Sequence, residues 1–444
     1  MTLLAAQPAG DIASLTLVEA AAAVRRKKLS PVELTKACLD RIARLNPSLN
    51  AFITISADQA LAEAHRLERE RPRGPIHGVP IALKDLIDTA GTRTTAASHI
   101  YADRVPDQDA EVVRRLRLAG AVILGKVNMD EFAYNFTSET SYFGAAHNPW
   151  NPKMTPGGSS GGSAVAVAAR MCFGALGSDT GGSIRLPASF CGIAGFKPSY
   201  GLVPATGVLP LAWSMDHVGP MCRTVADTAL LLGAMTGAGD RFAIGRRPAR
   251  LRVGVARKFF FDGLDPEVAS AMNAALDAMK GLGMEVREVE LPDIPSLPII
   301  RAEALAWHEP LMKKHLAGYH PHTLHEIREG ERVTVGEYAR ALRELERLRL
   351  AVRRTFNEVD AVVTPTSPLP PFPLGTKPDL VYLRNTIPFN VFGLPAISIP
   401  CGFTGTGMPI GLQVSAAPQA EAAVLVVAHA YEQATEWHRK SPRV

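Results

Sequence analysis

Short apolar segments alternate with amphipathic stretches along most of this 444-residue chain, and this alternation limits the fold more than any other feature. Residues 80–83 (Pro-Ile-Ala-Leu) and 121–124 (Ala-Val-Ile-Leu) are apolar runs of the length typical of buried strands. A helix is expected between them over 109–118. Strands separated by helices favour a large mixed sheet, mostly parallel, covered by helices on both faces. We therefore predict an α/β fold.

The alternation extends over the rest of the chain and predicts the remaining elements. Residues 30–33 (Ser-Pro-Val-Glu) form a capping box with proline at the first helical position, which opens a helix to about residue 45. Further strands are expected at 51–55, 251–255, 285–291, 361–364, 396–400 and 410–414, and further helices at 56–70, 266–282, 298–358 and 420–432. We predict one domain over residues 1–444, with a helical cap around 300–358 as the alternative arrangement of that segment.

The composition excludes several classes of protein. Hydrophobic residues make up 47% of the chain and charged residues 20%, which is typical of a globular protein and not of a disordered one. The net charge of +5 is too small to indicate a nucleic-acid partner. Five widely spaced cysteines without a CxxC pair predict reduced thiols and a cytoplasmic location. We expect no signal peptide at residues 1–8 and no membrane helix, because no apolar run approaches about 18 residues.

Glycine is concentrated in one part of the chain, since residues 144–201 hold 12 of the 37 glycines. Two glycine–serine clusters lie there, at 157–163 and 177–183, and each precedes an expected helix, at 164–170 and 184–190. Consecutive glycines before a helix allow several backbone N–H groups to point at one ligand atom, as a developing oxyanion requires. The serines in these clusters are candidate nucleophiles, and a pair of tight turns is the purely structural alternative.

Two segments match the motifs of other active sites only in part. Residues 120–126 have the spacing of a P-loop, but the intervening residues are apolar strand formers and Val127 replaces the Mg²⁺-binding Ser or Thr. Residues 157–161 fit G-x-S-x-G, but the irregular segment 151–156 precedes them where the elbow of an α/β-hydrolase requires a strand. No spacing of His, Cys, Asp and Glu suits a metal site. We expect neither a metal nor a cofactor.

The segment from Gly157 to Gly201 resembles the defining motif of the amidase signature family. Ser159 and Ser183 lie 24 positions apart, and Gly-Gly-Ser-Ile-Arg-Leu-Pro at 181–187 follows the family pattern closely. The family also places a lysine at the end of an apolar strand, which matches Lys84, 75 residues before Ser159. Further similarity is found at 128–132, 196–201, 393–396 and 411–413. The resemblance therefore spans nearly the whole chain and implies the family's α/β fold.

The resemblance implies a Ser–cis-Ser–Lys triad that cleaves C–N bonds through an acyl-enzyme. Ser183 would be the nucleophile, and Ser159, in a cis peptide, would relay its proton to Lys84. Lys84 must be neutral to accept a proton, and burial behind an apolar strand would lower its pKa. The expected oxyanion hole consists of the N–H groups of Thr180, Gly181, Gly182 and Ser183. Ser160 and Arg185 are expected to support this loop through hydrogen bonds.

The family motif does not select a substrate. Our main prediction is a stand-alone hydrolase of small or aromatic amides, with carbamates as further small-molecule substrates. The candidates to line its apolar pocket are Phe132, Tyr134, Phe136, Trp213, Met215 and Phe389. A homodimer is compatible with such an enzyme, and neither nucleic acid nor membrane is an expected partner.

The alternative function is that of the A subunit of a glutamyl-tRNA amidotransferase, which releases ammonia from glutamine. That branch of the family is usually longer and carries an acidic residue shortly before Thr-Ile-Pro, where it holds the substrate amino group. Residues 382–385 (Tyr-Leu-Arg-Asn) precede Thr386 in this chain and include no acid. Arg349 is a candidate to bind a carboxylate, although a charged helix face explains this arginine equally well.

Overall fold

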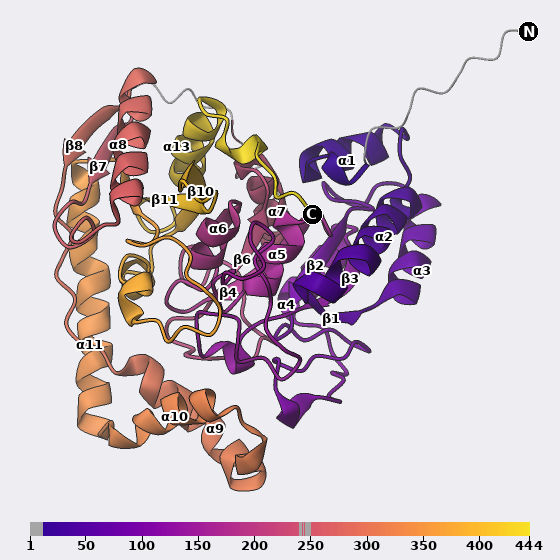
Figure 1. Cartoon of the computed structure of the whole chain (residues 1–444), viewed down its shortest axis with the longest axis horizontal. Coiled ribbons are helices and arrows are strands. Elements are labelled where there is room, and N and C mark those ends of the chain that lie inside the picture. The colour runs from indigo at the N-terminus through magenta and orange to yellow at the C-terminus, as the bar shows by residue number, and fades with distance from the viewer. Residues whose placement is uncertain (1–11, 239–241, 243, 245–249) are drawn as a thin grey trace, which may run out of the picture.

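A single mixed sheet forms the centre of the protein (Figure 1). The computed structural model describes residues 12–238, 242, 244 and 250–444. The strands are β1 (Phe52–Ile55), β2 (Pro80–Lys84), β3 (Val122–Val127), β4 (Gly174–Asp179), β5 (Ala194–Lys197), β6 (His217–Cys222), β7 (Arg252–Val255), β8 (Glu285–Glu288), β9 (Ala361–Pro365), β10 (Ala396–Phe403) and β11 (Pro409–Ser415). Their order in the eleven-stranded sheet is β1-β3-β2-β4-β6-β5-β10-β11-β9-β7-β8.

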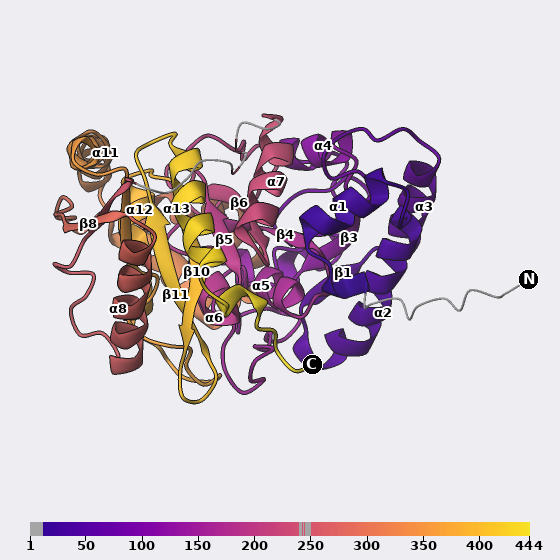
Figure 2. The same cartoon turned by 90° about the horizontal axis from the view of Figure 1, so that it is seen from above.

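Helices lie on both sides of this sheet, as Figure 2 shows for α7 on one side and α5 and α6 on the other. The helices are α1 (Leu17–Arg25), α2 (Pro31–Leu49), α3 (Ala57–Glu68), α4 (Glu111–Leu118), α5 (Gly161–Ala168), α6 (Arg185–Cys191), α7 (Val225–Thr236), α8 (Pro266–Gly281), α9 (Ile299–His315), α10 (Pro321–Arg328), α11 (Val335–Ala351), α12 (Ile387–Val391) and α13 (Glu421–Gln433). The predicted α/β fold with a large mixed sheet is confirmed.

The expectation that the sheet is mostly parallel is wrong. Among the ten strand pairings of the described residues, β2–β3, β2–β4, β7–β8 and β7–β9 are parallel and the other six are antiparallel. Parallel neighbours need a long crossover, whereas antiparallel neighbours can be joined by short loops. The loop at 404–408 joins β10 and β11 as a hairpin, and no α-helix separates β5 from β6. Counting strand–helix alternations cannot detect such pairs.

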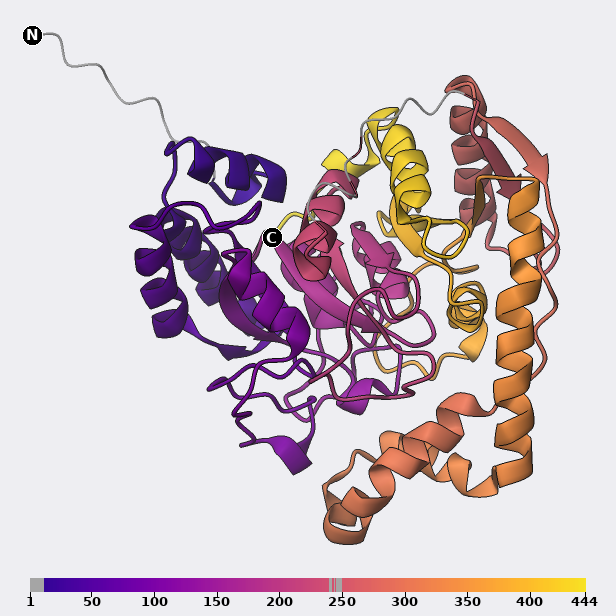
Figure 3. The ribbon, with the colours of Figure 1, turned by 180° about the vertical axis from the view of Figure 1, so that it is seen from behind.

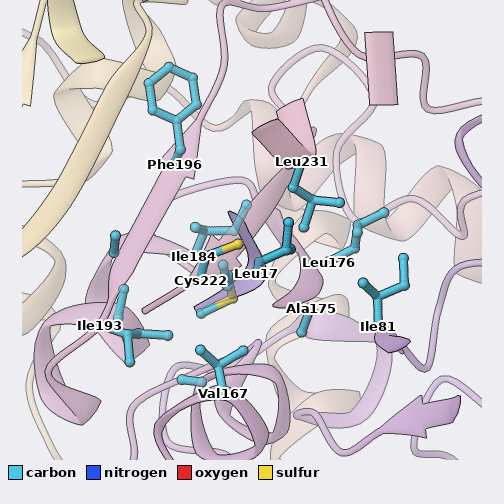
Figure 4. Close-up of a cluster of buried hydrophobic side chains, with 14 of the residues drawn as sticks. Leu17, Ile81, Val167, Ala175, Leu176, Ile184, Ile193, Phe196, Cys222 and Leu231 are labelled. Atoms are coloured by element: carbon cyan, nitrogen blue, oxygen red, sulfur yellow. The ribbon is translucent and has the colours of Figure 1, made fainter. Parts of the chain in front are cut away.

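The central strands are buried on both faces, and this burial positions the end of β2. Every residue of β2 and β4 is buried, and Ile81 and Leu176 from these strands belong to the largest apolar cluster. Figure 4 shows that Val167 of α5 and Leu231 of α7 approach these strands from different sides. Because the strands are covered by helices, the polar side chain at the end of β2, Lys84, lies inside the protein and not at its surface.

The segment predicted to be rich in helices forms α9, α10 and α11. Figure 3 shows these helices as an arm along one side of the body, and we call α9–α11 the helical arm. The arm contacts the body through apolar residues of α9 and α11 in a second core cluster that includes Ile299, Leu345 and Phe389. Because all eleven strands share one sheet, we keep the proposal of a single domain.

Three expectations concern the chain as a whole. All five cysteines are free and buried, as the prediction of reduced thiols requires. None of the helices in the described ranges combines the length and the apolar content that crossing a membrane needs. Residues 1–8, where the sequence predicts no signal peptide, lie outside the described residues.

Candidate active site

Lys84 is the last residue of β2 and is completely buried. Its Nζ atom donates a hydrogen bond to Ser159 Oγ at 2.7 Å and a second one to Ser178 Oγ at 2.9 Å. Ser159 comes from the loop before α5, and Ser178 lies on β4, which pairs in parallel with β2. The sheet thus brings one lysine and two serines together from three separate parts of the sequence.

The pKa of Lys84 is lowered from its usual value near 10.5 to about 7. Burial is the largest cause, because it removes the water that stabilises the ammonium ion. Three nearby carboxylates oppose the shift through their negative charge, namely those of the buried Asp130 and Asp179 and of the half-buried Asp216. At neutral pH a substantial fraction of Lys84 is therefore a neutral amine, which can accept a proton from a hydroxyl group.

The loop that carries Ser159 is packed tightly against its surroundings. The Gly158–Ser159 peptide bond is cis, as the family resemblance implies for this serine. A Cβ atom on Gly158 would lie 2.2 Å from Asp130 Oδ2 and 2.8 Å from the carbonyl carbon of Phe136, so only glycine fits there. The Asp130 N–H donates to the carbonyl of Ser159 at 3.3 Å. These contacts fix Ser159 against the end of β2.

Ser183 lies in the turn between β4 and α6 and is 8% exposed, unlike the fully buried Lys84 and Ser159. The backbone ties its loop to that of Ser159, because the Ser160 N–H donates to the carbonyl of Ser183 at 3.2 Å. The Ser160 hydroxyl also donates to the carbonyl of Ser178 at 3.1 Å. The two glycine–serine clusters are therefore neighbours in space, and Ser160 supports the loop as expected.

A buried ion pair holds the Ser183 turn in place. Asp179 and Arg185 are both fully buried and lie 2.8 Å apart between Oδ1 and Nη2. Burial by itself would raise the pKa of Asp179, but the Arg185 guanidinium outweighs this effect and the pKa lies well below its ordinary value. Arg185 also donates to Gln413 Oε1 at 2.7 Å and to Asn390 Oδ1 at 2.6 Å. Sequence reasoning identified Arg185 as a support but missed Asp179, Asn390 and Gln413.

Three of the four expected oxyanion-hole donors are available. The N–H groups of Thr180, Gly181 and Ser183 have no hydrogen-bond partner in the described part of the chain. The expectation that Gly182 is the fourth donor is wrong, because its N–H already donates to Asp179 Oδ1 at 2.8 Å. Gly182 has instead a geometric role. Its φ is +137°, and a Cβ atom on it would lie 2.2 Å from the hydroxyl oxygen of Thr386, so only glycine fits there.

A cavity of about 250 Å³ adjoins Ser178 and Thr180. Its wall is apolar where Leu86, Val208, Leu209, Leu211 and Val218 line it, and it is polar at Asp216 and His217. Asp216 accepts a hydrogen bond from the Thr180 hydroxyl at 2.5 Å. Sequence reasoning missed both polar residues, since a single Asp-His pair between apolar residues gives no spacing signal.

Of the aromatic and apolar residues predicted for the substrate pocket, only Trp213 lines this cavity. Phe389 is fully buried and packs on Phe260 at 5.7 Å between ring centroids. Met215 belongs to the same core cluster, and Phe132 packs on His308 at 4.7 Å. Tyr134 and Phe136 do not line the cavity either. Phe132, Met215 and Phe389 are therefore core residues, because an apolar side chain looks the same in sequence whether it faces a pocket or the core.

The sequence profile of the family described as Amidase matches residues 33–425 of the chain. This chain belongs to the Amidase family. As a member of this family it is an enzyme that hydrolyses C–N bonds. The resemblance to the amidase signature is thereby confirmed.

Relatives of this amidase carry different names. The glutamyl-tRNA(Gln) amidotransferase A subunit of Methylococcus capsulatus is 41% identical over 96% of this chain and 98% of that protein. The structure of the corresponding Thermotoga maritima protein superposes with a TM-score of 0.80, at 34% identity and 95% coverage of both chains. The structure of a 6-aminohexanoate cyclic dimer hydrolase gives a TM-score of 0.89 at 31% identity, covering 97% of this chain and 99% of that one.

Two residues bear on whether the chain resembles the amidotransferase subunits or the hydrolase more in its substrate contacts. Arg349 of the amidase is half-buried, donates to the carbonyl of Ser214 at 2.8 Å and lies 4.4 Å from the ring centre of Tyr200. Asn385, in the segment that lacks an acid, is fully buried, and its amide donates to the carbonyls of Phe260 and Pro365. Asn385 thus stabilises neighbouring loops, and its uncharged amide does not replace a carboxylate that would hold a substrate ammonium group. Among the described residues, no group of three metal-binding side chains is present.

Proposed function

We propose that the protein hydrolyses an amide through an acyl-enzyme on Ser183, with Ser159 and Lys84 as the proton relay. The observation that carries this proposal is the 2.7 Å hydrogen bond between Lys84 Nζ and Ser159 Oγ, two fully buried side chains. A buried lysine with a pKa of about 7 and a hydroxyl partner is a base that works at neutral pH.

In the first half of the reaction, Ser183 Oγ attacks the amide carbonyl carbon. The Ser183 proton passes to Ser159 Oγ while the Ser159 proton passes to Lys84 Nζ. The negative charge on the carbonyl oxygen would be stabilised by the N–H groups of Thr180, Gly181 and Ser183. The C–N bond then breaks, and the leaving nitrogen takes the proton back through Ser159.

In the second half, water attacks the acyl ester carbon on Ser183. Its proton follows the same path to Lys84, and the ester C–O bond breaks as the proton returns to Ser183 Oγ. The carboxylic acid leaves and the free serine is restored. Because the intermediate is an ester of serine, esters and carbamates are further substrates of this site.

For the substrate, we propose glutamine, with the chain acting as the A subunit of an amidotransferase that also needs partner subunits. The support is the 41% identity to the Methylococcus capsulatus protein over nearly both full lengths. Arg349, half-buried near the cavity wall residue Trp213, is the cation suited to the carboxylate of such a substrate.

The second candidate is a stand-alone hydrolase of other small amides. It is favoured by residues 382–385, which offer no carboxylate for a substrate ammonium group. The likeness to a 6-aminohexanoate cyclic dimer hydrolase supports the same candidate.

One experiment distinguishes the two candidates. The purified chain is incubated alone with glutamine, with 3-phenylpropanamide and with an aryl carbamate, and the released ammonia or amine is measured. Hydrolysis of the phenyl amide or the carbamate, but not of glutamine, supports the stand-alone enzyme. Glutamine hydrolysis that appears or rises strongly only when the amidotransferase partner subunits are added supports the amidotransferase. Turnover that survives in Ser183→Ala contradicts the shared mechanism.

A further inference from the structure

Ser214 lies in the loop that forms one wall of the cavity. Its N–H, hydroxyl and carbonyl groups all form hydrogen bonds with residues of the helical arm. Its N–H donates to Glu303 Oε2 at 2.9 Å, and its hydroxyl donates to Glu303 Oε1. Its carbonyl accepts a hydrogen bond from Arg349 Nη2 at 2.8 Å. Glu303 belongs to α9 and Arg349 to α11. The contact between the arm and the loop is thus made of specific hydrogen bonds as well as apolar packing.

Glu303 is an unusual residue for a merely structural contact, because this acidic residue is only 1% exposed. No lysine or arginine of the described residues forms an ion pair with it. Its hydrogen bonds come from Ser214 and from the Tyr338 hydroxyl, which donates to Oε1 at 2.8 Å. A buried carboxylate is stable only where such donors stay in place. The position of Glu303 and that of Ser214 therefore depend on each other.

Two residues close to Ser214 in the chain face the cavity, whereas the adjacent Met215 packs in the core. Trp213 and Asp216 both line the cavity. Asp216 also accepts from the N–H groups of Leu211 and Ala212, which closes the loop into a short turn. Through its bond to the Thr180 hydroxyl, the same carboxylate reaches the loop of the proposed nucleophile. A shift of Ser214 would therefore move the cavity wall.

We infer that Glu303 is a positioning residue that fixes this wall through Ser214 and so determines which amides the cavity admits. The inference rests on the proposed function and takes the cavity beside Ser178 and Thr180 as the place of the substrate. The hydrogen bonds of Lys84 go to Ser159 and Ser178, not to the Ser214 loop. Asp216 is held by the N–H groups of Leu211 and Ala212 and not by Glu303, so loss of Glu303 should weaken substrate binding and leave the chemical step nearly unchanged.

The first test does not require turnover. Acrylamide quenching of Trp213 fluorescence, obtained as the difference between each protein and its Trp213→Phe version, reports how well the wall is held. Glu303→Ala should raise the Trp213 quenching constant about twofold, and Glu303→Gln, which keeps one acceptor oxygen but turns an NH2 group toward a donor, should raise it less. The matched control is Glu309→Ala, an exposed residue of the same helix that pairs with Lys313. Equal quenching in Glu303→Ala and Glu309→Ala overturns the inference.

The second test compares a small amide, propanamide, with a bulky one, 3-phenylpropanamide. A loss of binding free energy equal to about one hydrogen bond corresponds to about a tenfold weaker binding constant. We expect Glu303→Ala to raise KM about tenfold for the bulky amide and less than threefold for propanamide, with kcat within twofold for both. An equal fall of kcat for both amides contradicts the inference. If Glu303→Ala does not fold, Glu303→Gln and Ser214→Ala are measured in its place.

The proposed function and the role of Glu303 can fail separately. If Ser183→Ala hydrolyses both amides as fast as the wild type, the proposed function is wrong, while the quenching result still decides the role of Glu303. If the wild-type chain hydrolyses neither amide, the quenching result alone decides it.

Discussion

Two buried lysines at the ends of neighbouring parallel strands show what distinguishes a candidate base from a structural cation. Lys84 ends β2 and Lys126 lies near the end of β3, and both are completely buried. Burial lowers the pKa of both, to about 7 for Lys84 and to about 8 for Lys126. Their partners differ, because Lys84 bonds two hydroxyl groups and Lys126 bonds the carbonyl of Ile87.

The difference in partners decides what each lysine can do. A hydroxyl group can give its proton to a neutral amine, whereas a carbonyl oxygen has no proton to give. Asp85 is the largest charged influence that keeps the pKa of Lys126 from falling further. We conclude that a depressed lysine pKa is not sufficient to identify a base, and that the identity of the hydrogen-bond partner is the better criterion.

The largest expected effect separates these two lysines directly. Lys84→Met should lower kcat for amide hydrolysis by about a thousandfold or more, because it removes the proposed base. Lys126→Met should keep kcat within about threefold. Steady-state rates of both variants, with circular dichroism as the control for folding, provide the measurement. Equal losses in the two variants would show that the hydrogen-bond partner does not distinguish the lysines.

The pH dependence sharpens the same comparison. The base must be neutral, so kcat/KM should rise with pH and reach half of its plateau near pH 7, the pKa of Lys84. Lys126→Met should leave this midpoint unchanged. A rate profile from pH 5 to 9 in both proteins is the measurement. A rate that is flat or falls over this range would mean that Lys84 is not the base.

Lys126→Met should lower the free energy of unfolding, although it should keep its activity. Lys126→Met leaves the Asp85 carboxylate buried without its nearby cation and the carbonyl of Ile87 without its donor. Leaving a buried carbonyl without its donor costs about 1–3 kcal/mol of unfolding free energy. A larger cost of about 3–5 kcal/mol is expected for Arg185→Ala, which breaks the buried ion pair with Asp179. Urea unfolding measures both, and a loss below about 1 kcal/mol in each would contradict this expectation.

The smallest effect tests the cavity wall against the core. Trp213→Leu should raise KM for a bulky amide a few-fold with little change in stability, because Trp213 is 46% exposed and lines the cavity. Phe389→Leu should instead lower the free energy of unfolding by about 1 kcal/mol, since Phe389 is fully buried. Kinetics and urea unfolding of the two variants are compared. A KM effect in Phe389→Leu that exceeds the effect in Trp213→Leu would place Phe389, and not Trp213, in the substrate pocket.

The sequence predicts the apolar strands well and the polar connections poorly. The segment Pro-Ile-Ala-Leu-Lys at 80–84 predicts a buried strand that ends in a lysine, and the structure has this strand. Val-Ile-Leu-Gly-Lys at 122–126 has the same pattern, and nothing in the sequence alone shows that only the first lysine meets serines. The family resemblance, not the periodicity, singled out Lys84.

What the sequence could not predict depends on contacts between distant segments. Asp179 and Asn390 are joined across 211 positions, and the alternation of apolar residues says nothing about such a pair. The strands β4, β5 and β6 were missed because glycine-rich or polar residues lower their apparent strand propensity. Likewise the burial of Phe389 follows from the packing of the helical arm, which no local pattern records.

The central claim is that Ser183 is the nucleophile and Lys84 its base, and active-site labelling tests it most directly. The protein is treated with an aryl phosphonofluoridate, and peptide mapping by mass spectrometry locates the adduct. We predict labelling of Ser183 in the wild type and in Lys126→Met, with labelling slowed at least about a hundredfold in Lys84→Met. An adduct on Ser159 or Ser178, or equal labelling rates in Lys84→Met and Lys126→Met, would contradict the claim.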